Sequence, residues 1–176
     1  VEIGNEDWFD KSGSYSGRYA QFYKAIKAAY PNLQIIATAP VTGIRPDIID
    51  DHYYRSAQGF FEDVHHYDKT DRNGPKIMVG EWATREGSPT SNFGAALGDA
   101  AWMTGMERNS DIIVLASYAP LFVNVNPGGM QWPSDLIGYD ALNSYGSPSY
   151  HAQVMFNEHL GDHVLESKLD APNPRL

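Results

Sequence analysis

Hydrophobic and polar positions alternate along the chain in blocks that predict strands and helices by turns. Short, uninterrupted apolar runs are typical of strands that are buried on both faces, as in a parallel sheet. Runs of this kind predict five strands: Val1–Gly4, Leu33–Ala39, Ile48–Ile49, Ile77–Gly80 and Asp111–Ser117. The third is the hardest to assign, because it leads directly into the polar stretch Asp51–Tyr54.

Between these runs, apolar residues recur at spacings of three and four, which is the period of a helix with one buried face. The first such stripe extends from Tyr19 to Tyr30, with Ser14 or Ser16 as a cap and Pro31 as the stop. Three further helices are predicted, over Ser56–Lys69, over Asn92–Arg108 and from a cap at Ser149 to near Gly161.

Strands that alternate with helices predict βαβ units and an α/β fold with a parallel sheet. A doubly wound sheet is one solution, but no Gly-rich phosphate loop follows any strand. A (β/α)8 TIM barrel is the other. It is favoured because polar, reactive residues follow the strands, as they do at the C-terminal face of such barrels. A full barrel needs about 250 residues, so a chain of 176 is expected to hold the C-terminal portion, about strands 4 to 8.

The domain organisation follows from this assignment. Residues 1–165 are expected to form the partial barrel, and residues 166–176, which contain Pro172 and Pro174, a linker or the start of a following domain. The segment Tyr118–Pro148 is rich in turn residues, and is predicted to be a large loop or to carry small elements of its own. The chain starts inside a strand and without Met, so we expect it to be a piece of a longer polypeptide.

Composition narrows the classes of partner. The net charge of −9 argues against a nucleic acid, because phosphate binding needs clustered Lys and Arg. No apolar run approaches the roughly 20 residues that span a bilayer, so no membrane partner is expected. The absence of cysteine excludes disulfides and Cys-based zinc sites but leaves the compartment open, with an extracellular location slightly favoured. The aromatic content of 12% suits sugar binding, although most of these rings are expected in the core.

Two carboxylates follow buried strands in similar settings. Glu6 comes after Val1–Gly4, and Glu81 comes directly after Ile77–Gly80 with Trp82 behind it. Cleavage of a glycosidic bond needs one carboxylic acid to protonate the leaving oxygen, and a second carboxylate to attack the sugar or to activate water. Strand ends hold such groups firmly, and in a barrel these two strands face each other across the top. We therefore expect Glu6 and Glu81 to meet.

Other polar and aromatic residues have simpler interpretations. Ordinary solvated charges are expected at Glu2, Glu62, Glu107 and Glu158. The pair His65–His66 is interpreted as part of a solvated helix face, because no partner is spaced to complete a metal site. Trp8 and Trp102 are expected to pack in the core. His52, taken alone, fits a core histidine as well as a functional one.

Four motifs occur in order along the chain: Val1–Glu6, Asp51–Tyr54, Val79–Trp82 and Ser117–Asn124. Together they resemble the α-L-arabinofuranosidases of glycoside hydrolase family 51. This family belongs to clan A, whose acid/base and nucleophile lie at the ends of strands four and seven of a (β/α)8 barrel. The resemblance covers nearly the whole chain.

The resemblance implies roles for individual residues. Glu6 corresponds to the general acid/base and Glu81 to the nucleophile. Contacts to the substrate are expected from Asn5, His52, Tyr54, Trp82 and Trp132. Asn5 corresponds to the residue that bonds the sugar 2-hydroxyl, His52 to a residue near the acid/base and Tyr54 to one near the nucleophile. Some members stack a Trp on the sugar a few residues beyond the nucleophile. Here Trp82 is adjacent to it, and Trp132 is the alternative.

The resemblance further implies a retaining exo-glycosidase that releases terminal α-L-arabinofuranosyl groups by double displacement, with no cofactor and no metal. Its partner is an arabinose-containing polysaccharide or oligosaccharide such as arabinoxylan or arabinan, which places the reaction in hemicellulose degradation. Family members often form oligomers, so a homo-oligomer is open for the full-length protein. We expect the carboxyl groups of Glu6 and Glu81 to lie roughly 5 Å apart, the retaining separation.

Two alternatives stay open on the residues alone. One is another clan A glycosidase, such as a xylanase or a β-glycosidase. The other is a non-catalytic sugar-binding protein or an inactive fragment. Five barrel units leave their first and last strands unpaired, so residues 1–176 by themselves are expected to hydrolyse little or nothing.

Overall fold

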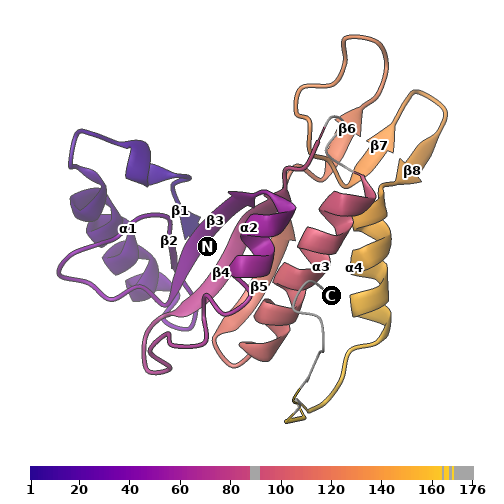
Figure 1. Ribbon diagram of the computed structural model, residues 1–176. Coiled ribbons are helices and arrows are strands. Elements are labelled where there is room, and N and C mark those ends of the chain that lie inside the picture. Colours follow the sequence, from indigo (N-terminus) through magenta and orange to yellow (C-terminus); the bar gives the residue numbers. More distant parts are fainter. Residues whose placement is uncertain (88–91, 164, 167, 169–176) are drawn as a thin grey trace.

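The protein is built on a parallel five-stranded sheet whose strands follow one another in chain order (Figure 1). The computed structural model describes residues 1–87, 92–163, 165, 166 and 168. Each strand pairs in parallel with the next. The strands are β1 (Glu2–Ile3), β2 (Ile36–Ala37), β3 (Ile48–Arg55), β4 (Lys76–Thr84) and β5 (Ile113–Tyr118). The five predicted strands are thus confirmed.

Helices connect the strands and cover one side of the sheet. The helices are α1 (Tyr15–Ala29), α2 (Ala57–Glu62), α3 (Phe93–Arg108) and α4 (Pro148–Glu158), and a short 3-10 helix, η1 (Asp7–Phe9), follows β1. Figure 1 shows α2, α3 and α4 side by side along one face of β3–β5. Strand–helix units with their helices on one face form the wall of a barrel. Among the described residues, no helix is both long and apolar enough to cross a membrane.

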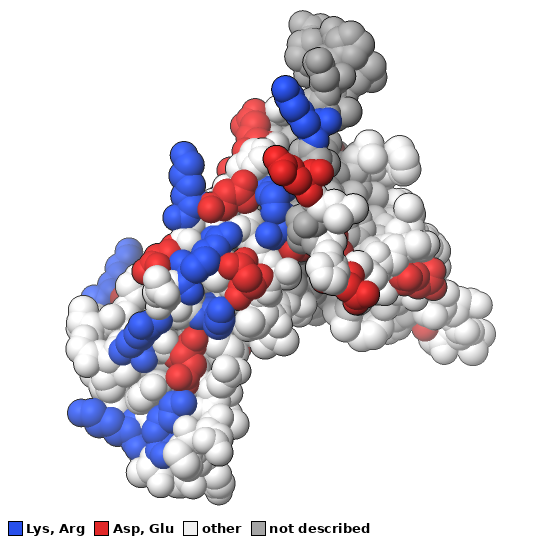
Figure 2. Space-filling model, turned by 90° about the horizontal axis from the view of Figure 1, so that it is seen from below, with Lys and Arg blue, Asp and Glu red and all other residues white. Residues whose placement is uncertain are grey.

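Two clusters of buried side chains hold these layers together. The larger lies between β4, β5 and helices α2–α4, and includes the fully buried Phe60, Val79 and Trp102. The smaller lies between α1 and β2, around Tyr19 and Ile35. Among the described charged residues, Asp50, Asp99 and Asp135 are buried. On the face seen in Figure 2, Lys and Arg are interspersed with Asp and Glu.

A small second sheet occupies part of the segment that was expected to be a loop or to carry small elements. It consists of β6 (Phe122–Asn124), β7 (Ile137–Tyr139) and β8 (Ser144–Gly146), with β6 and β7 parallel and β7 and β8 antiparallel. It lies near the start of α4 (Figure 1). Of residues 166–176, predicted to form a linker or the start of a following domain, all but 166 and 168 lie outside the described part of the chain.

Two predicted boundaries were wrong because backbone hydrogen bonds, which the apolar pattern does not reveal, decide them. β3 extends to Arg55 instead of stopping near Ile49, because its ladder with β4 continues through the polar residues. The helix predicted over Ser56–Lys69 ends at Glu62. The chain beyond it closes short turns, such as the 2.9 Å bond from the His66 N–H to the Asp63 carbonyl, which give the backbone another way to satisfy its polar groups.

The start of the last helix is also corrected. Ser147, not Ser149, caps α4, because its side-chain oxygen accepts the Tyr150 N–H at 3.2 Å. Pro148 is the first helical residue, a position where its missing N–H costs nothing. Ser149 is fully buried inside the first turn.

Candidate active site

Glu6 lies in a tight turn just beyond β1. Gly4 has a φ of 101°, and a Cβ at this position would lie 1.8 Å from Asp7 Oδ2. Glu6 itself has a φ of 51° and a ψ of 37°, a left-handed conformation that is uncommon for residues other than glycine and is often found at functional sites. Asp7 Oδ2 holds the turn by accepting the Asn5 N–H at 2.9 Å and the Thr38 hydroxyl at 2.8 Å. The turn therefore fixes the direction of Glu6.

Glu81 lies inside β4, at a β-bulge. Asp51 is opposite Val79, but His52 is opposite Glu81, so Gly80 has no partner residue in β3. An extra residue in one strand shifts the alternation of the following side chains by one position. Without the bulge, Gly80 would oppose His52 and Glu81 would point to the other face. The bulge therefore brings Glu81 to the side on which His52 lies.

Asp50 stabilises this bulge from β3. Its Oδ1 accepts the Gly80 N–H at 2.9 Å, and a Cβ at Gly80 would lie 2.0 Å from the same oxygen. Only glycine fits there without a shift of Asp50. The other oxygen, Oδ2, lies 2.7 Å from His52 Nε2. The buried carboxylate thus contacts both strands that form the site.

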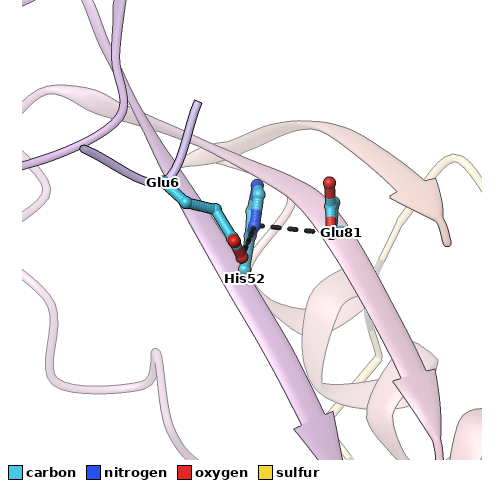
Figure 3. A group of neighbouring side chains, drawn as sticks. All are labelled: Glu6, His52 and Glu81. Atoms are coloured by element: carbon cyan, nitrogen blue, oxygen red, sulfur yellow. Dashed lines mark hydrogen bonds and ion pairs between the residues drawn. The ribbon is translucent and has the colours of Figure 1, made fainter. Parts of the chain in front are cut away.

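His52 joins the two glutamates (Figure 3). Its Nδ1 lies 2.9 Å from Glu6 Oε1 and 3.5 Å from Glu81 Oε2. The three side chains come from the turn after β1, from β3 and from β4, and one oxygen of Glu6 lies within 4.8 Å of one oxygen of Glu81. The structure therefore brings the two glutamates together, as the strand pattern predicts.

The charges around His52 favour its protonated form. Burial acts to lower the pKa of the imidazole, whose side chain is 3% exposed. The hydrogen bond to Glu6 and the negative charges of Asp50 and Glu81 outweigh that effect, so the pKa of His52 is raised. A protonated His52 has two N–H donors, one for Glu6 and one for Asp50.

Tyr54 supports Glu81 from the same strand as His52. Its hydroxyl donates a 2.6 Å hydrogen bond to Glu81 Oε2. Burial raises the pKa of Tyr54, and the hydrogen bond to Glu81 raises it further, so the phenol keeps its proton and stays a donor. The Arg85 guanidinium lies over the Tyr54 ring, 4.2 Å from its centroid, and helps to hold the ring in place.

Glu2 is exposed, as the sequence predicts, but its carboxyl meets the buried Asp50. Desolvation raises the pKa of its carboxyl to about 7, and a hydrogen bond to Asp50 and the charge of Asp50 act in the same direction. Two carboxyl groups in contact share a proton, because both cannot be ionised at low cost. A third acidic group therefore lies beside the site, on β1.

Glu6, His52 and Glu81 are the one group of metal-ligating residues in the described part of the chain whose ligand atoms lie this close together. Hydrogen bonds already account for their proximity. His52 Nδ1 faces Glu6, and Glu81 Oε2 accepts the Tyr54 hydroxyl. We interpret the group as two acids bridged by an imidazole, not as a cation site.

Comparison with known proteins places this geometry in a family. Residues 80–175 match the domain described as Alpha-L-arabinofuranosidase C-terminal domain, and residues 1–72 match the Alpha-L-arabinofuranosidase 1 domain. Alpha-L-arabinofuranosidase 2 of Arabidopsis thaliana is 43% identical over 96% of this chain and 25% of its own length. An arabinose-bound α-L-arabinofuranosidase of glycoside hydrolase family 51 superposes with a TM-score of 0.87 at 36% identity, over 97% of this chain and 29% of that one. The chain belongs to this family.

The strand–helix units described above are therefore part of the (β/α)8 barrel of family 51. A relative from Streptomyces chartreusis, named an extracellular exo-α-L-arabinofuranosidase, is 34% identical over 96% of this chain and 21% of its own length. The chain spans about a quarter of the length of the curated relatives it matches, such as 25% for the Arabidopsis protein. This quarter of the length includes both glutamates of the site.

The other residues suggested by the family resemblance lie in different settings. Asn5 is exposed next to Glu6. Trp82 is 2% exposed, and its ring packs on Tyr118 at 5.2 Å. The expectation that Trp82 contacts the sugar is corrected, because the residue after Glu81 alternates to the face covered by helices. Trp132 is 57% exposed in the β6–β7 connection, and among the described residues no ring contact or hydrogen bond joins it to the glutamates.

Two residues at the site were not predicted from the sequence. Trp8, expected in the core, is 43% exposed, and its ring meets His52 edge-on with centroids 5.2 Å apart. Its place two residues after Glu6 was the available signal. Asp50 precedes His52 by two positions in a strand, which puts both side chains on one face. That signal was hidden because β3 was expected to end before His52.

Proposed function

We propose that this chain supplies both catalytic carboxylates of a retaining α-L-arabinofuranosidase, with Glu81 as the nucleophile and Glu6 as the general acid/base. The observation that carries the proposal is the approach of their oxygens to within 4.8 Å. Retaining enzymes hold their carboxyl groups roughly 5–5.5 Å apart, whereas inverting enzymes leave about 6.5–9.5 Å for a water molecule. The separation favours direct attack by one glutamate.

In the first step, one carboxylate oxygen of Glu81 attacks the anomeric carbon while Glu6 passes its proton to the departing glycosidic oxygen. The carbon–oxygen bond to the leaving group breaks, and an arabinofuranosyl ester of Glu81 forms. The Tyr54 hydroxyl bonds Glu81 Oε2 at 2.6 Å and so fixes the plane of the nucleophile. In the second step, Glu6 takes a proton from water, the water oxygen attacks the anomeric carbon, and arabinose leaves with retained configuration.

The substrate class follows from the family. We propose terminal α-L-arabinofuranosyl groups on arabinoxylan, arabinan or their oligosaccharides, with Asn5, which is exposed beside Glu6, as the partner of the sugar 2-hydroxyl. The exo mode and an extracellular location are supported by the name of the Streptomyces chartreusis relative. The proposal concerns the full-length protein, in which further strands pair with β1 and β5. Residues 1–176 alone are expected to show little or no hydrolysis.

The test uses azide as a substitute nucleophile in the full-length protein, with an aryl α-L-arabinofuranoside as substrate. In Glu81→Ala, azide can enter only from the face that Glu81 vacates, so the expected product is the β-arabinofuranosyl azide. In Glu6→Ala, the ester still forms and azide replaces water, so the α-azide is expected. The two anomers are distinguished by NMR.

Three results would contradict this assignment. They are the same anomer from both variants, no azide adduct from Glu81→Ala, and near-normal activity of Glu81→Ala without azide. An aryl β-xyloside serves as the comparison substrate. Faster hydrolysis of the xyloside than of the arabinofuranoside would favour another clan A glycosidase. Sugar binding without turnover of either substrate would favour a non-catalytic protein.

A further inference from the structure

Asp50 is the most deeply buried carboxylate of the site, with a side chain that is 1% exposed. It lies on β3, one side-chain layer below the glutamates. Its two oxygens contact different strands: Oδ2 lies 2.7 Å from His52 Nε2, and Oδ1 accepts the Gly80 N–H at 2.9 Å. A buried carboxylate is retained only when donors compensate its charge, and here both donors belong to the frame of the two glutamates.

The first contact leads to Glu6. An acceptor that binds one ring nitrogen of a histidine fixes the orientation of the ring, and with it the direction in which the other nitrogen points. Asp50 at Nε2 therefore directs Nδ1 toward Glu6 Oε1, where the distance is 2.9 Å. Among the described residues, this imidazole is the only side chain that hydrogen-bonds the Glu6 carboxylate.

The second contact leads to Glu81. The bulge at Gly80 leaves that residue without a partner in β3, and a buried backbone N–H without an acceptor is costly. Asp50 Oδ1 provides the acceptor. It also occupies the space in which a Cβ at Gly80 would lie, 2.0 Å away. The bulge that turns Glu81 into the site thus depends on the position of Asp50.

We propose that Asp50 is a positioning residue that sets the geometry of both catalytic carboxylates at once, Glu6 through the ring of His52 and Glu81 through the bulge at Gly80. The inference rests on the proposed function, because it assigns Asp50 a role relative to Glu6 and Glu81. A carboxylate is required because it offers an acceptor to each of two N–H groups. An amide offers one acceptor and one donor, so one of the two contacts is lost.

The groups around Asp50 are those whose protonation its charge affects. Glu2 hydrogen-bonds it from β1, where desolvation raises the pKa of Glu2 to about 7, with Asp50 as the next cause. His52 contacts it from β3, and Gly80, followed by Glu81, contacts it from β4. Glu6 lies beyond His52. The negative charge of Asp50 therefore favours the protonated form of His52.

The test is Asp50→Asn in the full-length protein, assayed with aryl α-L-arabinofuranosides of increasing leaving-group pKa. We expect kcat to fall about 100-fold, the loss that a misplacement of about 1 Å causes, with KM changed by less than about threefold. The loss should persist with the best leaving group, because Glu81 is misplaced, and it should grow with poorer leaving groups, because these also need the proton of Glu6. The alkaline limb of kcat/KM should move to lower pH, because removal of the negative charge of Asp50 weakens the hold of His52 on its proton.

Asp51→Asn is the matched control. It makes the same chemical change one residue along β3, but Asp51 accepts the Tyr67 hydroxyl at 3.1 Å, away from the glutamates. We expect its kcat and both pH limbs to match those of the unchanged protein. If Asp51→Asn shifts the alkaline limb as Asp50→Asn does, or if Asp50→Asn lowers activity equally at every pH and for every leaving group, the proposal is overturned.

Glu2→Gln covers the case in which Asp50→Asn does not fold, because it keeps the size of an exposed side chain. It removes the charge that Glu2 places on Asp50 above about pH 7, so the alkaline limb should again move to lower pH, with a smaller loss of kcat. An unchanged limb would overturn the proposal. Failure of the proposed function is a separate result, since it shows in the azide products of Glu6→Ala and Glu81→Ala whatever Asp50 does.

Discussion

The two glutamates of the site are held by different devices. Glu81 lies within β4, a strand paired on both sides, with β3 and with β5. Glu6 lies beyond β1, an edge strand of two residues that pairs with β2 alone among the described elements. The position of Glu81 is therefore set by the register of a ladder. That of Glu6 is set by one turn, in which Asp7 binds Thr38 and the backbone of Asn5.

This difference predicts which substitutions disturb the position of each glutamate. A change at the bulge moves a strand that also borders His52, so it is expected to disturb both glutamates. A change in the turn after β1 moves Glu6 alone. A leaving group of low pKa departs without a proton donor, so activated substrates report on Glu81, whereas poor leaving groups report on both residues.

The largest expected effect within this comparison is that of Gly80→Ala. The new Cβ would lie 2.0 Å from Asp50 Oδ1. The other oxygen of this buried carboxylate, Oδ2, lies 2.7 Å from His52 Nε2, so Asp50 has little freedom to move. We expect kcat to fall about 100-fold with activated and poor leaving groups alike, measured with a series of aryl α-L-arabinofuranosides in the full-length protein.

Gly4→Ala is the counterpart in the turn. Its Cβ would lie 1.8 Å from Asp7 Oδ2, at a φ of 101°, so the loss should be confined to poor leaving groups. Gly17→Ala, in α1, is the control, because nothing lies within 4 Å of the new Cβ and alanine favours a helix. Equal losses of Gly4→Ala and Gly80→Ala on the best leaving group would break the comparison.

Tyr54→Phe is expected to have an intermediate effect. It removes the 2.6 Å hydrogen bond to Glu81 Oε2, and a hydrogen bond to a charged group contributes about 1.5–3 kcal/mol, so kcat should fall at least about tenfold. The loss should be the same for all leaving groups, because Glu6 is untouched. Tyr53→Phe, whose hydroxyl instead meets His66 Nε2 at 3.0 Å, should stay within about twofold. A loss for Tyr54→Phe that grows with leaving-group pKa would contradict the assignment of Tyr54 to Glu81.

Thr38→Val is expected to have the smallest effect. Valine keeps the shape of the buried side chain but removes the 2.8 Å bond to Asp7, which should lower the free energy of unfolding by about 1 kcal/mol. Urea unfolding measures this change, and activity should fall only a few-fold, with poor leaving groups. Thr42→Val, at an exposed position on the same connection, is the control. If both variants lose equal stability, Thr38 does not hold the turn.

Much of the fold could be predicted because its signals are local. Buried parallel strands are continuous apolar runs, and the stripe from Tyr19 to Tyr30 indicates a helix whatever it packs against. The end of α2 and the length of β3 could not be predicted in this way. The length of β3 is decided by its ladder with β4, a distant part of the chain. The end of α2 is decided by short turns beyond it, which the spacing of apolar residues does not reveal.

The site shows the same division. Glu6 and Glu81 stand out in the sequence because a carboxylate directly after an apolar run has no ordinary structural use, and parallel strands end at one edge of a sheet. Trp82 was assigned wrongly, and Trp8 and Asp50 were missed. The face on which a side chain lies depends on the bulge at Gly80, and the apolar pattern of β4 does not reveal a one-residue shift.

The sequence by itself determined the strand–helix order, the family and the two glutamates, because these depend on residue types and on spacings of a few positions. Only the tertiary structure decided that His52 stands between the glutamates, that Asp50 lies beneath His52 and Gly80, and that Glu2 adds a third acid. The reason is physical. Register, bulges and the sharing of protons between acids arise when strands far apart in the chain are brought within a few ångströms. A local sequence pattern contains no information about which distant strands meet.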